Sequence, residues 1–523
     1  MSHENRSSDP KPAQPATTSV YAIYGVEPEV QAYAMAKYSR SSLSMKESLR
    51  EISEQRAEKF LNTYYFQYGH RSIADLAHIA MAIERLSILA AIAVVDEQRW
   101  DGQERSTRYQ DFSHPDYHLP EFGASGSAQR RFCDTIDFLF GEYQTISARM
   151  FRHLQERTPR PIDMKQEAYD RTLRARAFDV ARYLLPLTTN TSLGQIVNAR
   201  TLESQISRLL SDRFPEVRAL GESLKEAARN PAYNVNGYAL RELWEEIRAR
   251  DEGWGNNVYD LLMKEVRPAP TLVKYAEASP YLMRSREELA AASAELMAGA
   301  AVAPGPPVDL LDDEPLEVEV ATTLLYEHCA YPYRQIRERV AALGAGERRE
   351  IVDLGVKHRG PHDELLRAFS AGQTLRFDIL MDIGGFRDLH RHRRCVQIHQ
   401  AFTDVHGYEA PDELAAAGLR QRYDDAMERV QGAVAELKRT AAAEDARTDA
   451  LYLLPLAFRK RTLFKMDFAE AAYISELRTG AAGHFSYRRI AYLMYEAVAQ
   501  RYPTLARHFR VTDVREPVDL LKR

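Results

Sequence analysis

The chain has 523 residues, of which 45% are hydrophobic and 28% charged, and a formal net charge of −5. This length exceeds one domain, and the composition is that of a globular protein able to bury a substantial core. The negative charge argues against a protein that coats nucleic acid over its whole surface, although a local basic pocket for a phosphate is compatible with it.

The cysteines and the N-terminus bear on the compartment. Cys133, Cys329 and Cys395 lie far apart and form no CxxC pair, so we expect neither a disulfide framework nor a four-thiolate zinc site, and a cytoplasmic location fits. Residues 1–18 have no apolar core and predict a disordered tail rather than a signal peptide. No run of about 20 apolar residues exists, so we expect no membrane span.

The first half begins with a predicted strand at 19–25 and a helical region at 28–68. Ser72 is a plausible N-cap for an apolar helix that we predict to continue through Ala82. Another apolar helix at 87–95 leads to a polar loop at 101–109. Amphipathic helices follow at 128–158 and 171–182, before a Leu-Leu-Pro break at 183–187 and a helix from Asn198 to about Leu210.

The second half repeats this order. Residues 316–320 alternate like a strand, and the mainly apolar 377–382 predicts another. Gly384 and Gly385 then turn the chain into a short helix that ends at the cluster His-Arg-His-Arg-Arg, residues 390–394. Later, 450–456 matches 181–187 almost residue for residue.

Matching segments recur roughly 270 to 295 residues apart, which indicates duplication of a whole domain rather than a short-repeat solenoid. We therefore divide the chain into a tail at 1–18, a first repeat at 19–264, a connector at 265–310 and a more diverged second repeat at 311–523. The connector is bounded by Pro-rich segments and carries an Ala/Glu-rich helix.

The cluster at 390–394 is the densest positive patch of the chain. Arginine binds phosphates through two parallel hydrogen bonds and stacks on planar rings, so the cluster is a candidate cofactor site. A basic surface turn is the plainer interpretation. A metal site built from His390, His392, Cys395 and His399 is a third, but the adjacent guanidinium groups would repel a cation, so we expect no metal.

Glu104, Ser106 and Arg108 alternate in a glycine-containing loop, which can offer a hydroxyl, a guanidinium and backbone N–H groups to a phosphate. A polar surface loop is the alternative. Five further candidates have structural alternatives of their own, as loop, cap or helix-surface residues: His70, Ser72, Arg182, Asn198 and Arg200. Arg478 can also simply complement a helix dipole.

The ordered set of segments resembles the flavin-dependent thymidylate synthases. That family has a Gly-His-x-Ser/Thr helix start, then Arg-His-Arg, Glu-x-Ser-x-Arg-Tyr, Arg-x-x-Leu-Pro, Asn-x-Arg and a final arginine. The first half supplies residues 69–72, 104–109, 182–186 and 198–200, but has Asp96, Glu97 and Gln98 in place of Arg-His-Arg and Leu209 in place of the final arginine. The second half supplies Arg391, His392, Arg393 and Arg478, but has His399, Gln400 and Ala401 in place of Glu-x-Ser.

The resemblance implies an α+β fold in two tandem copies, each a central sheet flanked by long helices, packed as a pseudo-dimer. Family members are homotetramers with active sites between subunits. Reduced FAD, supplied with electrons by NADPH, carries a one-carbon unit from methylenetetrahydrofolate to dUMP, and arginines stabilise the phosphate and the polarised uracil. No membrane or nucleic-acid partner is implied, and a homodimer of the fused chain would mimic the four-domain assembly.

The losses in the two halves are complementary, so the resemblance implies one composite site per chain. Its flavin pocket would combine His70, Ser72, Asn198 and Arg200 with Arg391, His392 and Arg393. Its dUMP pocket would combine Glu104, Ser106, Arg108 and Arg182 with Arg478, of which Ser106 and Arg478 would act in catalysis. The reciprocal site, with Asp96–Gln98, Leu209 and His399–Ala401, would be inactive. The alternatives are a flavin and folate enzyme acting on another uridine nucleotide, and an inactive homologue that serves as a nucleic-acid or assembly scaffold.

Overall fold

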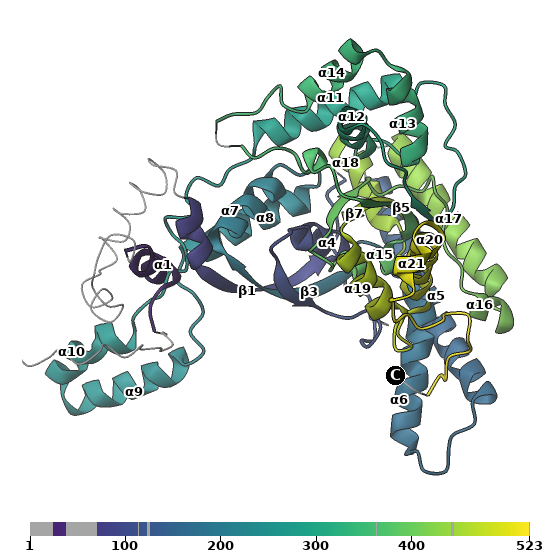
Figure 1. Cartoon of the computed structure of the whole chain (residues 1–523). Helices are drawn as coiled ribbons and strands as arrows, with labels where there is room; N and C mark the ends of the chain where they lie inside the picture. The colour runs from purple at the N-terminus through teal and green to yellow at the C-terminus, as the bar shows by residue number, and fades with distance from the viewer. Residues whose placement is uncertain are drawn as a thin grey trace, which may run out of the picture.

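The computed structural model describes residues 25–37, 71–112, 114–122, 126–361, 363–440 and 444–521 (Figure 1). The expected tail at 1–18, His70 and most of the expected strand at 19–25 lie outside these residues. The described chain forms a mixed α+β structure with two antiparallel sheets, one in each half. Within the described residues, no helix is both long and apolar enough to cross a bilayer.

The sheet of the first half has the strand order β1-β3-β2. β1 (His78–Ser87) and β2 (Asp101–Glu104) both pair antiparallel with the central β3 (Asn190–Asn198). The helix α4 (Ile88–Val95) continues directly from β1, and the Ser87 hydroxyl caps it by accepting a hydrogen bond from Ala90 N at 2.9 Å. After β3, the Asn198 side chain caps α7 (Ala199–Leu210) in the same way.

The sheet of the second half has the order β4-β5-β7-β6 and follows the same plan. β5 (Leu375–Asp382) runs into α15 (Ile383–Leu389), which Asp382 caps through Gly385 N. β7 (Arg459–Met466) runs into α19 (Phe468–Thr479). The outer strands are β4 (Val308–Leu310) and β6 (Val396–His399).

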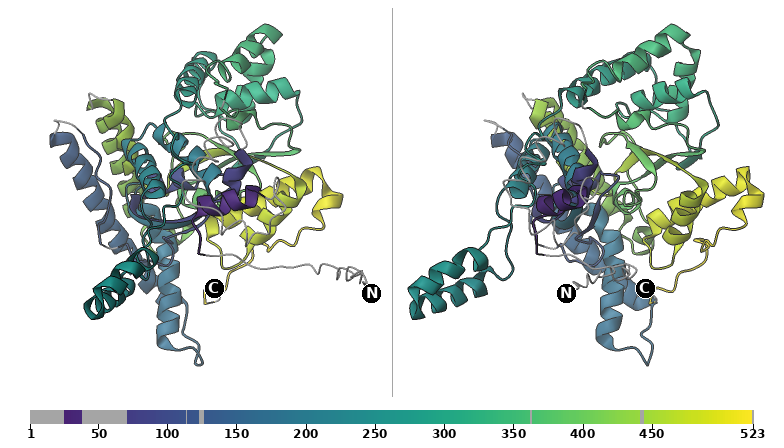
Figure 2. Two further views of the ribbon diagram at one scale, coloured as in Figure 1. Left: turned by 90° about the vertical axis from the view of Figure 1, so that its left-hand side faces the viewer. Right: turned by 60° about the vertical axis from the view of Figure 1, so that its left-hand side comes forward.

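Both faces of the second sheet are buried, whereas β1 and β3 of the first sheet alternate buried and exposed residues, so one face of that sheet is exposed. The long helices α5 (Gly126–Arg157) and α17 (Arg420–Thr440), one from each half, pack side by side (Figure 2). A second, smaller apolar core lies where α11 to α14 cover the second sheet. The remaining helices are α1 (Pro28–Lys37), α6 (Gln166–Ala181), α8 (Pro215–Arg229), α11 (Pro280–Leu296), α12 (Leu316–Tyr326), α13 (Tyr333–Ala342), α14 (Ala345–Leu354), α16 (Asp412–Ala416), α18 (Glu444–Asp449), α20 (Phe485–Arg501) and α21 (Pro503–Ala506).

The repeated Leu-Leu-Pro-Leu segments of the two halves pair with each other. Leu187 N donates to Leu454 O at 2.9 Å, and the counterpart Leu456 N donates to Leu185 O at 2.9 Å, on either side of a bridge between Pro186 and Pro455. Each hydrogen bond thus has an equivalent in which the halves exchange roles. One apolar core that includes residues of both halves surrounds this contact.

Helices α9 (Gly237–Arg250) and α10 (Glu252–Leu262) project from the body as a hairpin (Figure 1). Ala232 N donates to Val266 O at 2.8 Å and closes the base of this arm. The two helices approach closely at Gly255, where a Cβ would meet Arg248 Cα at 2.6 Å. No residue of α9 is buried, so the arm adds little to the core.

Three sequence predictions of secondary structure were wrong in whole or in part. The loop predicted at 101–109 begins with the strand β2, Asp101–Glu104, because these residues pair with β3. Residues 316–320 belong to α12, because Val318, Ala321 and Leu325 place buried groups at helical spacing and override the short alternation. The helix predicted from Ser72 to Ala82 is a 3₁₀ turn, Arg71–Leu76, followed by β1. The helices predicted at 87–95, 128–158 and 171–182, the strand at 377–382 and the break at 183–187 are confirmed.

Candidate functional site

The two motif fragments face each other where β2 of the first half meets the residues after α15. Arg391 donates to the Gln103 side chain at 2.8 Å, and Arg393 lies 3.4 Å from an Asp101 carboxylate oxygen. Arg387 forms an ion pair with Glu104. Along β2, Glu104, Gln103 and Asp101 thus contact Arg387, Arg391 and Arg393 in turn, and these three contacts join the halves. The Arg393 guanidinium also lies 4.7 Å from the centre of the Trp100 ring.

Arg108 lies deeper between the halves. Its Nε and Nη2 atoms donate to the two carboxylate oxygens of Asp179 at 2.7 and 3.2 Å, and Nη1 donates to the Tyr487 hydroxyl at 3.2 Å. Although burial opposes the charged form, Asp179 raises the pKa of Arg108. The guanidinium therefore stays charged. Ser106 shapes this turn, because its hydroxyl accepts from Arg108 N at 3.2 Å.

Arg478 contacts the same tyrosine, with its guanidinium 5.5 Å from the Tyr487 ring centre. Arg478 Nε donates to His392 Nε2 at 2.7 Å, and Glu470 lies 3.6 Å from His392 Nδ1. Burial lowers the pKa of His392, so the imidazole is neutral and can accept this hydrogen bond. His392 thus turns toward α19 of its own half rather than toward β2.

Arg182 is almost completely buried, and its partners are few. Among the described residues, its Nε and Nη2 atoms have no hydrogen-bond partner, and Nη1 lies 3.7 Å from Asp388. A buried guanidinium without partners is costly unless an anion completes its hydrogen bonds. This donor set fits a phosphate or a carboxylate.

The remaining flavin-site candidates form a separate group beside β1 and β3. Arg200 Nη1 lies 3.5 Å from Asp75, and Nη2 donates to Glu364 at 3.1 Å. Asn198 is committed to capping α7, and Ser72 is exposed on the 3₁₀ turn. Arg99 also pairs with Asp75, at 3.5 Å, so Arg99 and Trp100 connect this group to Arg393.

We call the six arginines at this contact between the halves the arginine junction: Arg108, Arg182, Arg387, Arg391, Arg393 and Arg478. A hollow of about 10 Å³ within it is lined by both halves, including Trp100, Glu104, Arg387 and Arg391. The hollow is narrow because Glu104 and Gln103 hold Arg387 and Arg391 across it. Within the described residues no group of three or more His, Cys, Asp or Glu side chains could hold a metal ion.

Sequence reasoning missed four members of the site. Arg387 lies one helical turn before Arg391, so its place on the same face could have been inferred. Asp388 and Asp179, which pair with Arg182 and Arg108, carry no motif signal. Tyr487 contacts arginines from both halves only because the fold brings α20 to the turn at Arg108.

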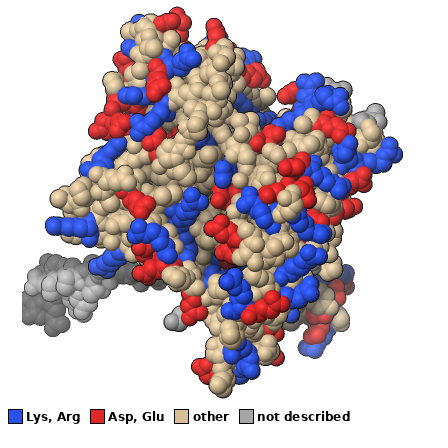
Figure 3. All heavy atoms as spheres, turned by 90° about the vertical axis from the view of Figure 1, so that its right-hand side faces the viewer, with Lys and Arg blue, Asp and Glu red and all other residues tan. Residues whose placement is uncertain are grey.

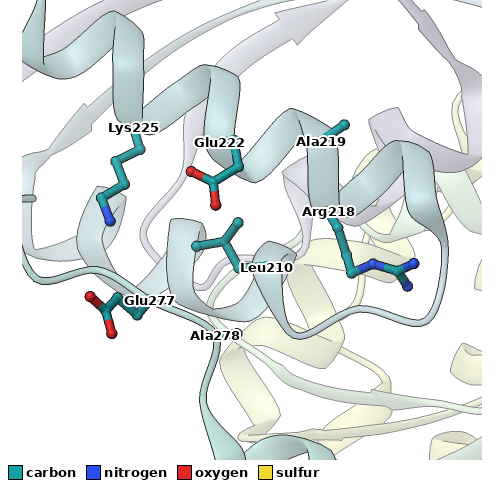
Figure 4. Close-up of a pocket in the computed structure, with 7 residues that line it drawn as sticks. All are labelled: Leu210, Arg218, Ala219, Glu222, Lys225, Glu277 and Ala278. Carbon is teal, nitrogen blue, oxygen red and sulfur yellow. The ribbon is translucent and has the colours of Figure 1, made fainter.

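A groove of about 460 Å³ lies elsewhere, between α8 and residues 277–278 (Figure 4). It is lined by charges of both signs, including Arg218, Lys225, Glu222 and Glu277. Lys225 Nζ is already bonded to Ala276 O at 2.6 Å. None of the predicted site residues lines this groove.

Comparisons relate this chain to known proteins. The model of a family described as "Thymidylate synthase complementing protein" matches residues 23–231 and 320–504. UPF0159 proteins of Chlamydia pneumoniae and Thermoplasma acidophilum are 26% and 25% identical over 95% and 92% of this chain, and over 92% and 94% of their own length. A flavin-dependent thymidylate synthase of Clostridium tetani is 23% identical over 41% of this chain and 84% of its own.

The solved structures that match include thymidylate synthase ThyX of Helicobacter pylori in complex with FAD and dUMP. It has 15% sequence identity and a TM-score of 0.23, and the match covers 39% of this chain and 89% of that chain.

Proposed function

Because this chain belongs to the family of thymidylate synthase complementing proteins, we propose that it is an FAD-dependent thymidylate synthase with one composite active site. It would convert dUMP to dTMP, with methylenetetrahydrofolate as the one-carbon donor and NADPH as the reductant. The observation that carries the proposal is the contact of the two motif fragments: Arg387, Arg391 and Arg393 of the second half each reach a β2 side chain of the first.

We further propose that the chain is a duplication packed as a pseudo-dimer. The exchange of hydrogen bonds between Leu185–Leu187 and Leu454–Leu456 supports it, because a twofold contact between identical subunits has this form. The two separate segments that match one family model support it as well.

We assign the dUMP phosphate to the more deeply buried, inner side of the arginine junction, where Arg108 and Arg182 lie. Arg182 supplies buried nitrogen atoms that have no partner among the described residues, and Arg108 and Arg478, which both contact Tyr487, add charge. Ser106 and Glu104 border the same turn. Binding would replace the contacts of Arg387 with Glu104 and of Arg391 with Gln103, and so widen the hollow.

FAD would supply the electron-transfer chemistry from the outer side of the junction. Arg391 and Arg393 would hold its phosphates, and the residues present fit such a group, since Arg393 Nε is buried without a partner among the described residues. Ser72, Asn198 and Arg200 would border it beside β1, and His70 is assigned there from the sequence alone. His392 contributes indirectly, because it orients Arg478.

Ser106 and Arg478 are the proposed catalytic residues. With one nitrogen bound to His392, Arg478 is fixed in direction and its other nitrogens can stabilise the polarised uracil. The neutral His392 adds no competing charge to that interaction.

The mixed surface charge supports an enzyme over a nucleic-acid scaffold. On the face drawn in Figure 3, acidic and basic side chains are interspersed, with no broad area of one sign. A scaffold for the phosphate backbone would instead need an extended basic surface.

The visible absorption spectrum of the purified protein tests the function. We expect a flavin band that shifts when dUMP is added and does not shift with UMP. A shift with UMP alone would identify an enzyme for another uridine nucleotide. A colourless protein that gains no band with added FAD would contradict the proposal.

A further inference from the structure

The place where the repeats would build a second site is occupied by ion pairs of the protein itself. Ile88 N bonds Thr189 O, and the counterpart Ile383 N bonds Phe458 O, both at 2.9 Å. Asp96 lies as far beyond Ile88 as Arg391 lies beyond Ile383. Asp96 therefore stands in the reciprocal site where Arg391 stands in the composite site, with the opposite charge.

Three second-half residues hold Asp96, and we call this set the Asp96 clamp: Asp96, Arg367, His390 and His399. Arg367 forms an ion pair with the carboxylate and donates to Asp96 O at 2.9 Å. His399 Nε2 lies 3.3 Å from Oδ2, and His390 Nε2 lies 3.7 Å from Oδ1. The first-half carboxylate thus fills the position that an anionic ligand of the second half would need.

The Asp96 carboxylate within this clamp is ionised. Burial opposes the charge of Asp96, but Arg367, His399 and Arg208 together hold its pKa well below the ordinary value. Next to it, Glu97 pairs with Arg208 at 2.8 Å. A buried pair of this kind is costly to break from one side, because the remaining charge loses its partner.

The arginine junction has two walls: β2 in the first half and residues 387–393 in the second. The Asp96 clamp connects them. Asp96 ends α4, and the chain then passes through Trp100 into β2. His390, on the other side of the carboxylate, directly precedes Arg391. Arg393 in turn covers the Trp100 ring. The Asp96 carboxylate is therefore close to the start of both walls.

We propose that Asp96 is a positioning residue: the inactive second site has become a clamp that fixes the two walls of the composite site relative to each other. Its importance for catalysis rests on the proposed function, whereas its effect on wall geometry does not.

The test uses Trp100 as a reporter in the full chain. The chain has three tryptophans, so Trp244→Phe and Trp254→Phe leave Trp100 as the only tryptophan, and fluorescence is excited at a wavelength that tyrosine does not absorb. Asp96→Asn is compared with Arg422→Gln, because Arg422 also pairs with a first-half carboxylate, Glu142, at 2.6 Å, but away from the junction. Quenching by acrylamide is measured well below the melting temperature of each variant.

We expect Asp96→Asn to increase the quenching of Trp100 by about twofold or more, as local opening exposes a buried ring, and Arg422→Gln to leave it unchanged. FAD affinity should fall by about tenfold or more in Asp96→Asn, since small displacements of binding groups are costly, and remain at the wild-type value in Arg422→Gln. If Asp96→Asn does not fold, Arg367→Lys is compared with Arg422→Lys, with the same expectation.

Equal quenching in the two variants would overturn the positioning role, whatever the protein binds. Absence of FAD binding by the wild-type chain would instead overturn the proposed function, while the quenching experiment would still decide the role of Asp96.

Discussion

Arg182 has a charged side chain that is buried with two nitrogens lacking partners among the described residues. We predict that Arg182→Met weakens dUMP binding by about tenfold or more, which corresponds to about 1.4 kcal/mol. Stability without ligand should fall by about 3 kcal/mol or less, because the buried Asp382 loses a favourable charge, whereas Asp388 retains contact with solvent. Titration calorimetry with dUMP and urea unfolding measure the two effects.

Arg394→Met is the matched control, since Arg394 follows the junction residue Arg393 directly but is exposed and pairs with Asp467. Unchanged dUMP affinity in Arg182→Met, or an equal loss in Arg394→Met, would show that Arg182 does not hold the phosphate.

Lys460 provides a pH-dependent test of the reciprocal site. Its Nζ lies 3.2 Å from His399 Nδ1, and the rings of Phe386 and Phe402 lie 5.1 and 4.2 Å away. Burial lowers the pKa of Lys460 to about 7, whereas the unfolded chain keeps an ordinary value of about 10.4. Between these values the unfolded state binds more protons, so this group makes stability rise with pH from about 7 to about 10.

The free energy of unfolding of Lys460→Met should therefore lack this rise, and the difference between variant and wild type should favour the variant most at pH 7 and below. Urea unfolding at pH 7, 8.5 and 10 measures that difference. A difference that does not vary with pH would mean that Lys460 is protonated over the whole range.

At the scale of elements, long periodic segments were predictable, as were the short apolar runs of α4 and β5, whereas β1 and α12 were not. The helices α5 and α6 carry amphipathic patterns over many residues, and their prediction is confirmed. β1 was taken for a helix, because its composition is compatible with either, and only pairing with β3, more than 100 residues away, decides for a strand. The start of α12 alternates like a strand. It forms a helix because it packs against α11, α13 and α14, and the local sequence does not show these tertiary contacts.

The candidate site divides in the same way. Residues within a contiguous motif, such as Arg391 and Arg393, could be singled out from the sequence because the family pattern fixes their spacing. Asp179 and Tyr487 could not, because each matters only through the distant arginine that it contacts. The orientation of His392 toward Arg478 likewise depends on how α19 packs against the turn after α15.

The projecting arm of α9 and α10 is expected to be dispensable for folding. Its base is closed by the hydrogen bond from Ala232 to Val266, and no residue of α9 is buried. Replacing residues 234–264 by a short Gly/Ser linker should therefore leave the melting temperature within about 4 °C of the wild type and the flavin band unchanged. A collapse of either would assign the arm a role in folding or in the site. Calorimetry and absorbance provide the readouts.

At the scale of the whole molecule, the two halves keep equivalent contacts through different residues. The Ser87 hydroxyl donates to Glu216 at 2.6 Å, and in the other half the Ser486 hydroxyl donates to Asp382. The carboxylate and the hydroxyl have exchanged places between equivalent helices. At the equivalent positions Asp96 and Arg391 the charge is likewise reversed. In the proposed duplication, the composite site is therefore basic, whereas the reciprocal site is filled by the protein's own ion pairs. We therefore expect fusion to have halved the number of active sites.

Two fused chains would present four repeats, as many as the subunits of the homotetrameric family members. We therefore predict a homodimer, which sedimentation velocity at micromolar concentration should reveal as a single species of twice the chain mass. A species of the chain mass that retains flavin and dUMP binding would show that one chain suffices.

The number of FAD molecules bound per chain tests the central claim most directly. Equilibrium dialysis of the full chain with FAD, with bound flavin and protein quantified after denaturation, should saturate at one FAD per chain, and Arg393→Ala should abolish that binding. Saturation at two tightly bound FAD per chain, or full binding by Arg393→Ala, would contradict a single composite site.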